Sequence, residues 1–282
     1  MKAPYGELIP VEPGVARLLA RNPSPYTHTG TQVHLVGTDE LAVIDPGPAD
    51  PEHIDALMQA IGGRRVRAIL ITHTHKDHSP GAVPLRQATG APVVGCAPLV
   101  VREEQEAGFD RSYAPDRLLS DGEGIVVDGR RLTAIHTPGH TSNHLCFADE
   151  AAGILFSGDH VMGWSTSVVI PPDGNMGDYI RSLDKLRQRN GDRIYYPAHG
   201  DPISDPQRLV RGMITHRVQR ERQILRRIDE GDRTVEAIVA SAYPGLDPRL
   251  VPAAAASVLA HLLDLASRGL VARLGEQWTP NK

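Results

Sequence analysis

Cysteine is scarce in this chain, which has only two cysteines among 282 residues. Cys96 and Cys146 are far apart and form no C-x-x-C pair. We interpret them as two small, buried apolar side chains of a protein in a reducing compartment, because free cysteines are usually buried and structural disulfides need oxidising conditions.

Long apolar runs are also missing. Residues 1–7, MKAPYGE, lack the apolar core of a signal peptide, and no stretch approaches the length that spans a membrane. The alanine-rich residues 251–266 include His261 and Asp264 and predict a packed helix. We therefore expect a soluble, cytoplasmic protein with no membrane partner.

Aromatic side chains make up only 4% of the sequence, and the formal net charge is −4. A chain with this charge is not attracted to nucleic acid as a whole, although the value says nothing of local patches. Proteins that bind single strands normally stack bases on aromatic rings, so the low aromatic content argues against that class.

Residues 33–200 alternate short apolar runs with helical patterns, which is typical of an α/β fold. We expect helices at 51–61, 81–89 and 178–189, where apolar residues recur at helical spacing. We expect strands at 33–36, 41–45, 68–72, 92–95, 124–127, 132–136, 144–148, 153–157 and 193–196.

The pattern changes after Gly200. One long arginine-rich helix is expected over 206–231, followed by helices at 235–243 and 247–268 and a small hairpin of 270–274 with 277–279. Three helices and a hairpin are the order of elements in a winged-helix unit. We therefore predict a catalytic domain over residues 1–205 and a winged-helix-like domain over 206–282.

The densest group of polar side chains is residues 72–79, THTHKDHS, directly after the apolar run 68–71. It holds three imidazoles and a carboxylate, which are common ligands of borderline metal ions. Packing does not explain the run, because on a core strand His73 and His75 would face one side and both would need buried partners. Four ligands on one loop are too many for one tetrahedral ion that also admits a substrate, so the segment predicts two ions.

Three more ligand candidates, His140, Asp159 and His199, each follow an apolar strand. Before the first of them, Pro138 keeps the preceding residue extended and Gly139 permits a tight turn. Active sites of α/β proteins usually lie at the carboxyl ends of strands. Together with residues 72–79, these positions predict a single polar site.

These residues resemble the metallo-β-lactamase superfamily, whose motif is H-x-H-x-D-H followed by a further His, a bridging Asp and a last His. The resemblance implies an αββα sandwich, in which two mixed sheets are flanked by helices. It implies two metal ions, with Asp77 and Asp159 as catalytic residues. One ion is expected on His73, His75 and His140, the other on Asp77, His78 and His199, and Asp159 bridges them together with a hydroxide.

Two bridged divalent ions lower the pKa of water toward ~7, so such a centre would supply hydroxide for hydrolysis. Both ligand sets look complete, which favours hydrolysis over the redox variants of this fold that keep one iron. Zinc is expected from the imidazole-rich ligands, while manganese and iron stay open because they accept the same donors.

Three stretches resemble the branch of this superfamily called β-lactamase-like protein 2, namely residues 22–31, 163–167 and 174–179. Members of this branch carry a C-terminal winged-helix-like domain introduced by a basic helix, as here from His216 onward. One departure is that Gln32-Val33-His34 stands where the family usually has Asn-Thr-Tyr, which would alter the substrate if these positions line the cleft.

The resemblance leaves the substrate open. An animal member of the branch is a single-strand-selective endoribonuclease, and Arg217 and Arg220 on one helix face would then track RNA phosphates. The alternative is a small ester or thioester, as in glyoxalase II or lactonase relatives, with the arginines on its carboxylates. His34, Ser165 and Thr166 are further predicted substrate contacts.

Two other functions are disfavoured. A DNA-binding regulator with a vestigial enzyme core would not be expected to keep a complete set of seven ligands. A β-lactamase acting on antibiotics would be expected to carry an export signal. The oligomeric state is not indicated by any of these patterns.

Overall fold

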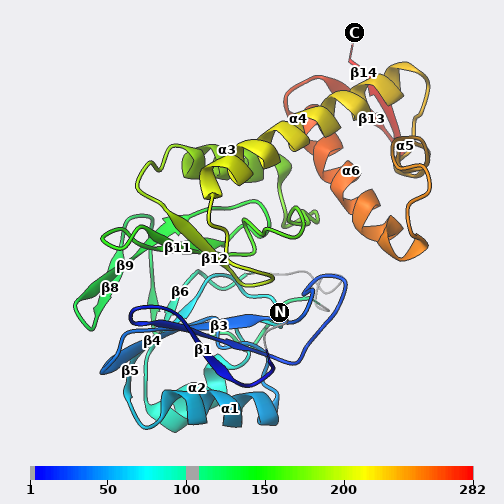
Figure 1. Cartoon of the computed structure of the whole chain (residues 1–282). Coiled ribbons are helices and arrows are strands. Elements are labelled where there is room, and N and C mark those ends of the chain that lie inside the picture. Colours follow the sequence, from blue (N-terminus) through cyan, green and yellow to red (C-terminus); the bar gives the residue numbers. More distant parts are fainter. Residues whose placement is uncertain (1–3, 100–107, 282) are drawn as a thin grey trace. The chain divides into compact units, whose positions relative to one another are not determined.

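The computed structural model describes residues 4–99 and 108–281 (Figure 1). By its internal contacts the chain divides into two compact units. Unit 1 comprises Met1–Thr137, Asn143–Ser165 and Asn190–Pro206, and unit 2 comprises Pro138–Ser142, Thr166–Arg189 and Gln207–Lys282. The last junction falls beside the predicted boundary at residue 205, while unit 2 also takes two segments from the middle of the chain.

Unit 1 contains a first sheet of seven strands in the order β1-β2-β3-β4-β5-β6-β7. Strands β1 to β4 pair antiparallel, and the pairs from β4 to β7 are parallel. The strands are β1 (Leu8–Glu12), β2 (Val15–Leu19), β3 (Gln32–Val36), β4 (Glu40–Ile44), β5 (Arg65–Ile71), β6 (Val93–Gly95) and β7 (Arg117–Leu118).

Two helices make the first two parallel crossovers of this sheet. Helix α1 (Pro51–Ile61) joins β4 to β5, and α2 (Ala82–Thr89) joins β5 to β6. Asp50 caps the start of α1, where its side chain accepts a hydrogen bond from the backbone N–H of His53, and Gly62 caps the end in the left-handed region. Both helices cover the outer face of the first sheet (Figure 1).

A second sheet of five strands has the order β12-β11-β10-β9-β8 and is antiparallel except for the pair β11–β12. The two sheets share one hydrophobic core, in which Leu35 and Val43 of the first sheet lie with Phe147 and Phe156 of the second. The strands are β8 (Gly124–Val127), β9 (Arg130–His136), β10 (Leu145–Asp149), β11 (Ile154–Gly158) and β12 (Ile194–Pro197).

Unit 2 contains a second, separate core around the buried Trp278. Helix α6 supplies Val258, Leu262 and Leu265 to this core. The elements of unit 2 are α3 (Met176–Arg187), α4 (Pro206–Asp229), α5 (Val235–Ala242), the 3₁₀ turn η2 (Pro248–Leu250), α6 (Val251–Ser267) and the hairpin β13 (Val271–Leu274) with β14 (Gln277–Pro280).

Residues Pro248–Ser267 are long and apolar enough to cross a membrane by length and composition alone. The expectation that no stretch reaches that length is therefore wrong. Part of this apolar composition belongs to the core of unit 2, since 33% of the apolar window is buried and Val258, Leu262 and Leu265 pack in the core with Trp278.

Candidate metal centre

The polar side chains predicted at the strand ends of unit 1 converge. The segment after β5 carries His73, His75, Asp77 and His78, while Asp159 follows β11 and His199 follows β12. The parallel strands β4 and β5 end at the same edge of the first sheet, as β11 and β12 do in the second. The carboxyl ends of these strands therefore supply the candidate ligands, as the sequence predicted.

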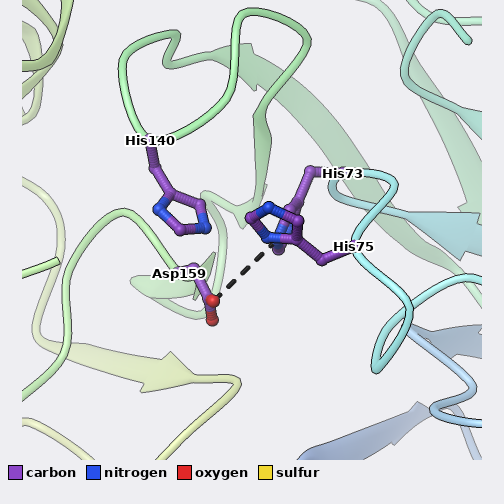
Figure 2. A group of neighbouring side chains, drawn as sticks. All are labelled: His73, His75, His140 and Asp159. Carbon is purple, nitrogen blue, oxygen red and sulfur yellow. Dashed lines mark hydrogen bonds and ion pairs between the residues drawn. The ribbon is translucent and has the colours of Figure 1, made fainter. Parts of the chain in front are cut away.

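One group of ligand atoms forms around His73. Its Nε2 lies 2.9 Å from Nδ1 of His75 and 3.9 Å from Oδ2 of Asp159. His140 completes the group, since one ligand atom from each of the four side chains lies within 4.8 Å of the others. Figure 2 shows the three rings and the carboxylate directed toward a common centre.

A second group forms around Asp77. Its Oδ2 lies 3.2 Å from Nε2 of His78 and 3.3 Å from Nε2 of His199. Asp159 reaches this group as well, with Oδ1 at 3.2 Å from Nε2 of His199 and Oδ2 at 3.5 Å from Nε2 of His78. The Asp159 carboxylate is thus adjacent to both groups.

Hydrogen bonds orient the rings of His199 and His140 so that one nitrogen of each is available to a metal ion. Nδ1 of His199 donates to the Gly30 carbonyl at 3.1 Å, and Nδ1 of His140 donates to the Val168 carbonyl at 2.7 Å. Because a carbonyl only accepts, the proton of each neutral ring sits on Nδ1 and the Nε2 lone pair faces the cluster. These bonds set the tautomers that a metal ion requires.

Asp45 is a member of the cluster that the sequence analysis missed. It is buried directly after β4, and its carboxylate accepts from the Thr72 hydroxyl at 2.7 Å, the Thr72 amide at 2.8 Å and Nδ1 of His78 at 3.0 Å. Since the Thr72 hydroxyl donates to Asp45, its oxygen accepts from Nδ1 of His73 at 3.0 Å. A carboxylate after an apolar run was the available signal, the same one that identified Asp159.

Two more residues outside the ligand groups hold the carboxylates in place. The Thr31 hydroxyl donates to Oδ2 of Asp77 at 2.8 Å and accepts from the Asn22 amide at 2.9 Å. Nε2 of His144 accepts from the backbone N–H of Asp159 at 3.2 Å. Such supporting bonds fix the orientation of ligands and tune their basicity.

In the protein without ions, the carboxylates and imidazoles of the cluster stabilise each other's charged forms. Burial alone would raise the pKa of Asp77 and Asp159, but His78 and His199 hold both pKa values well below the usual range. Burial opposes the charged imidazoles too, yet the two carboxylates raise the pKa of His199 to about 10 and the pKa of His78 well above its ordinary value.

The donors suit divalent ions that accept nitrogen and oxygen ligands. Nε2 of His78 is buried and has no hydrogen-bond partner among the residues that the structure describes, although two carboxylates lie within 3.5 Å. A bound cation would satisfy this nitrogen and neutralise the carboxylates. The cluster therefore fits the ions that the sequence predicted.

The predicted substrate contact at His34 is wrong. This side chain is 3% exposed and packs against the rings of Phe156 and Tyr196 in the core, where burial lowers its pKa to about 3. Gln32 does not line a cleft either, because its side-chain amide donates to the Gly200 carbonyl beside His199. Within the segment that departs from the family pattern, Gln32 therefore holds the loop that carries His199.

The two arginines expected to contact substrate from one face of α4 are not exposed. Arg217 is 3% exposed and donates to the Ser167 carbonyl and, at 3.3 Å, to the Ser257 hydroxyl. Arg220 is half-buried, with its guanidinium 3.9 Å from the centre of the Tyr243 ring. Ser165 is exposed and Thr166 is half-buried, and their contact with substrate stays a prediction.

Comparison with known proteins supports both parts of the predicted fold. Residues 26–199 match the model of the metallo-beta-lactamase superfamily, and residues 234–278 match the beta-lactamase associated winged helix domain. A metallo-beta-lactamase family protein of Thermus thermophilus is a similar solved structure, with TM-score 0.77, 25% identity and coverage of 95% of this chain and 99% of that one. The predicted fold class is confirmed.

Two proteins with similar sequences illustrate the range of names among the relatives of this chain. The chain is 32% identical over 274 residues to the beta-lactamase-like protein 2 homolog of Drosophila melanogaster, covering 90% of this chain and 88% of the relative. It is 30% identical over 233 residues to an atrochrysone carboxyl ACP thioesterase of Cryptosporiopsis sp. (strain 8999). That match covers 80% of this chain and 66% of the thioesterase.

Proposed function

The chain belongs to the metallo-β-lactamase superfamily and is a hydrolase, and from that premise we propose that it uses two metal ions to hydrolyse a small ester or thioester. The observation that carries the proposal is the position of Asp159. Its two carboxylate oxygens lie 3.2 Å from His199, 3.5 Å from His78 and 3.9 Å from His73. One carboxylate shared by two ligand groups is what a two-metal site requires.

The ligands divide into two sets around Asp159. When bound, two divalent ions lower the pKa of a water molecule toward ~7 and polarise the substrate carbonyl. Zinc suits the imidazole-rich donors, and manganese or iron accept the same atoms. In this proposal His73, His75 and His140 would hold the first ion, Asp77, His78 and His199 would hold the second, and Asp159 would contribute to both.

The protein's own contribution is to hold these donors rigidly. Asp45 and Thr72 fix the tautomers of His78 and His73, and Thr31 fixes the Asp77 carboxylate. Because these side chains are already oriented before substrate binds, they need little reorganisation during the reaction. Asp77 and Asp159, which keep their negative charge, offset the charge of the ions.

Two observations favour an ester or thioester over single-stranded RNA. A relative of 30% identity is named as an atrochrysone carboxyl ACP thioesterase. The arginines expected to track RNA, Arg217 and Arg220, lie buried or half-buried with partners inside unit 2. Neither lies in an exposed stripe of positive charge that could follow the successive phosphates of an extended RNA backbone.

An activity panel on the metal-loaded enzyme tests the proposal. It compares a glutathione thioester, an acyl-lactone, a phosphodiester reporter and single-stranded RNA. We expect kcat/KM for the thioester or lactone to exceed that for either phosphodiester by at least ~10-fold, about 1.4 kcal/mol of transition-state free energy. Faster cleavage of RNA would overturn the substrate assignment.

Metal analysis of variants tests the two-metal site separately. Wild-type protein should carry close to two metal equivalents, and His75→Ala or Asp159→Ala should lose both metal and turnover. His136→Ala is the control, because this histidine is exposed on β9. Full turnover by a metal-free preparation would contradict the mechanism.

A further inference from the structure

We propose that unit 2 contains a binding site for a phosphate group between α4 and α6, independent of the metal centre and of the proposed hydrolysis. Arg217 and Arg220 of α4 form one side of the site, and Ser257 and His261 of α6 form the other. The bond from Arg217 to the Ser257 hydroxyl links the two helices there.

The positive charge at this position is unbalanced. Among the described residues, no carboxylate forms an ion pair with Arg217 or Arg220. Three arginines elsewhere in unit 2 have a carboxylate partner, with Arg227 at 2.7 Å from Asp232, Arg249 at 2.7 Å from Asp247 and Arg268 at 2.8 Å from Asp264. A buried guanidinium without a counterion is costly, so an anion from outside the chain would stabilise this region.

The nearby acids do not compensate this charge. Glu221 follows Arg220 on α4, and Asp264 lies one turn beyond His261 on α6. Both carboxylates are paired with Arg268. Burial lowers the pKa of His261 to about 3, and Arg217 and Arg220 contribute to that decrease, so the ring is neutral at pH 7.

Several hydrogen-bond donors at this position are unused. Nε of Arg217 and both ring nitrogens of His261, one of which carries a proton in the neutral ring, are buried and have no hydrogen-bond partner in the described part of the chain. Among the residues with described positions, Arg220 bonds to Gln223 and to the Ala242 carbonyl through Nη1 alone. The site therefore offers free N–H groups of two guanidiniums and one imidazole, and buried donors normally have partners.

This chemistry matches a phosphate better than other anions. Guanidinium groups bind phosphate oxygens through paired, charge-assisted hydrogen bonds, and a phosphate monoester carries nearly two negative charges at pH 7. The packing of Arg220 over the Tyr243 ring holds one guanidinium in place before binding. The ligand is inorganic phosphate or the terminal phosphate of a small molecule.

Calorimetric titration of the metal-loaded protein tests the site. Inorganic phosphate and 4′-phosphopantetheine serve as probes, which separates a free ion from a monoester. Arg220→Gln should weaken the tighter-binding probe by at least ~10-fold, the loss expected when charge-assisted bonds are removed. Arg222→Gln is the matched control, because it removes the same charge from an exposed position of α4.

Any phosphate bound by the metal ions contributes equally in the three proteins and is subtracted. A second measurement, thermal unfolding with and without the probe, is used in case Arg220→Gln folds poorly. The probe should raise the melting temperature of wild type and Arg222→Gln, but not of Ser257→Ala or Arg220→Gln. Equal probe binding by wild type and Arg220→Gln would overturn the site. A single-stranded oligoribonucleotide is tested as a third probe. If Arg220→Gln loses binding to it and neither phosphate probe binds wild type, the phosphate site is overturned and a phosphodiester contact takes its place. Neither result depends on turnover, so failure of the proposed hydrolysis is seen separately.

Discussion

Asp45 has a larger influence on the metal centre than its absence from the ligand motif suggests. Its carboxylate accepts three hydrogen bonds, two from Thr72 and one from Nδ1 of His78. Through Thr72 it also sets the orientation of His73. A single buried carboxylate thus fixes one imidazole in each ligand group.

Asp45→Asn is therefore expected to weaken metal binding about 10- to 100-fold, the usual cost of losing such a supporting group. The amide has one acceptor oxygen and cannot serve Thr72 and His78 as the carboxylate does. Competition with a chromogenic chelator measures the affinity. Asp50→Asn, at the exposed start of α1, should bind metal like wild type. Unchanged affinity in Asp45→Asn would refute this role.

The residues that the sequence identified, and those that it did not, differ in a physical way. The histidines at 73, 75 and 78 form a dense local run, which needs no knowledge of the fold. Asp45 becomes a partner only when β4 and β5 pair, so its role is non-local. His34 was misplaced because β3 is buried along its whole length and has no solvent-facing side for a polar residue.

Elements were predicted more completely than single residues. Each of the nine expected strands lies within a few residues of its observed position, because short apolar runs between glycines and prolines are strong local signals. The hairpin of β1 and β2 was missed, since Pro10 and Glu12 interrupt the apolar alternation of β1. Strand β7 has two exposed residues and no pattern to detect.

The end of β11 depends on a glycine. Gly158 has φ +51, and a Cβ there would lie 2.6 Å from Nε2 of His144 and 3.0 Å from the Thr72 hydroxyl. Gly158→Ala should destabilise the protein by roughly 1–3 kcal/mol from backbone strain, in addition to the close contact with His144. Urea unfolding measures the change.

Gly191→Ala is the matched control, since its Cβ would meet no atom within 4 Å and its φ is not positive. Its free energy of unfolding should stay within ~0.5 kcal/mol of wild type. Equal stability of the two variants would show that the turn after β11 tolerates a side chain.

At the scale of the whole molecule, metal binding and protonation are linked. Without ions, His199 has a pKa of about 10 and the pKa of His78 is also raised, so both rings carry protons at pH 7. Because a metal ion binds only the neutral ring, it must displace those protons. Protons and metal ions therefore compete for the same nitrogens.

Apparent metal affinity should consequently rise as the pH increases from about 6.5 toward about 10. Each site that exchanges a proton for a metal ion should contribute a factor of up to ~10 per pH unit below its pKa. Chelator competition at pH 6.5, 7.5 and 8.5 measures the slope, and calorimetry in two buffers counts the protons released. A flat profile above pH 7 would mean that the rings are already neutral.

The placement of the ligands on strand ends also bears on how such a protein diversifies. Asp45, Asp159 and His199 are attached to β4, β11 and β12, which are anchored in the shared core of unit 1. Ser165 and Thr166 lie in the loop that follows Asp159, between β11 and α3, and neither is among the candidate ligands. Such loop positions can accumulate substitutions while Asp159 stays anchored at the end of β11, so selection can alter substrate preference while the reaction itself is inherited unchanged.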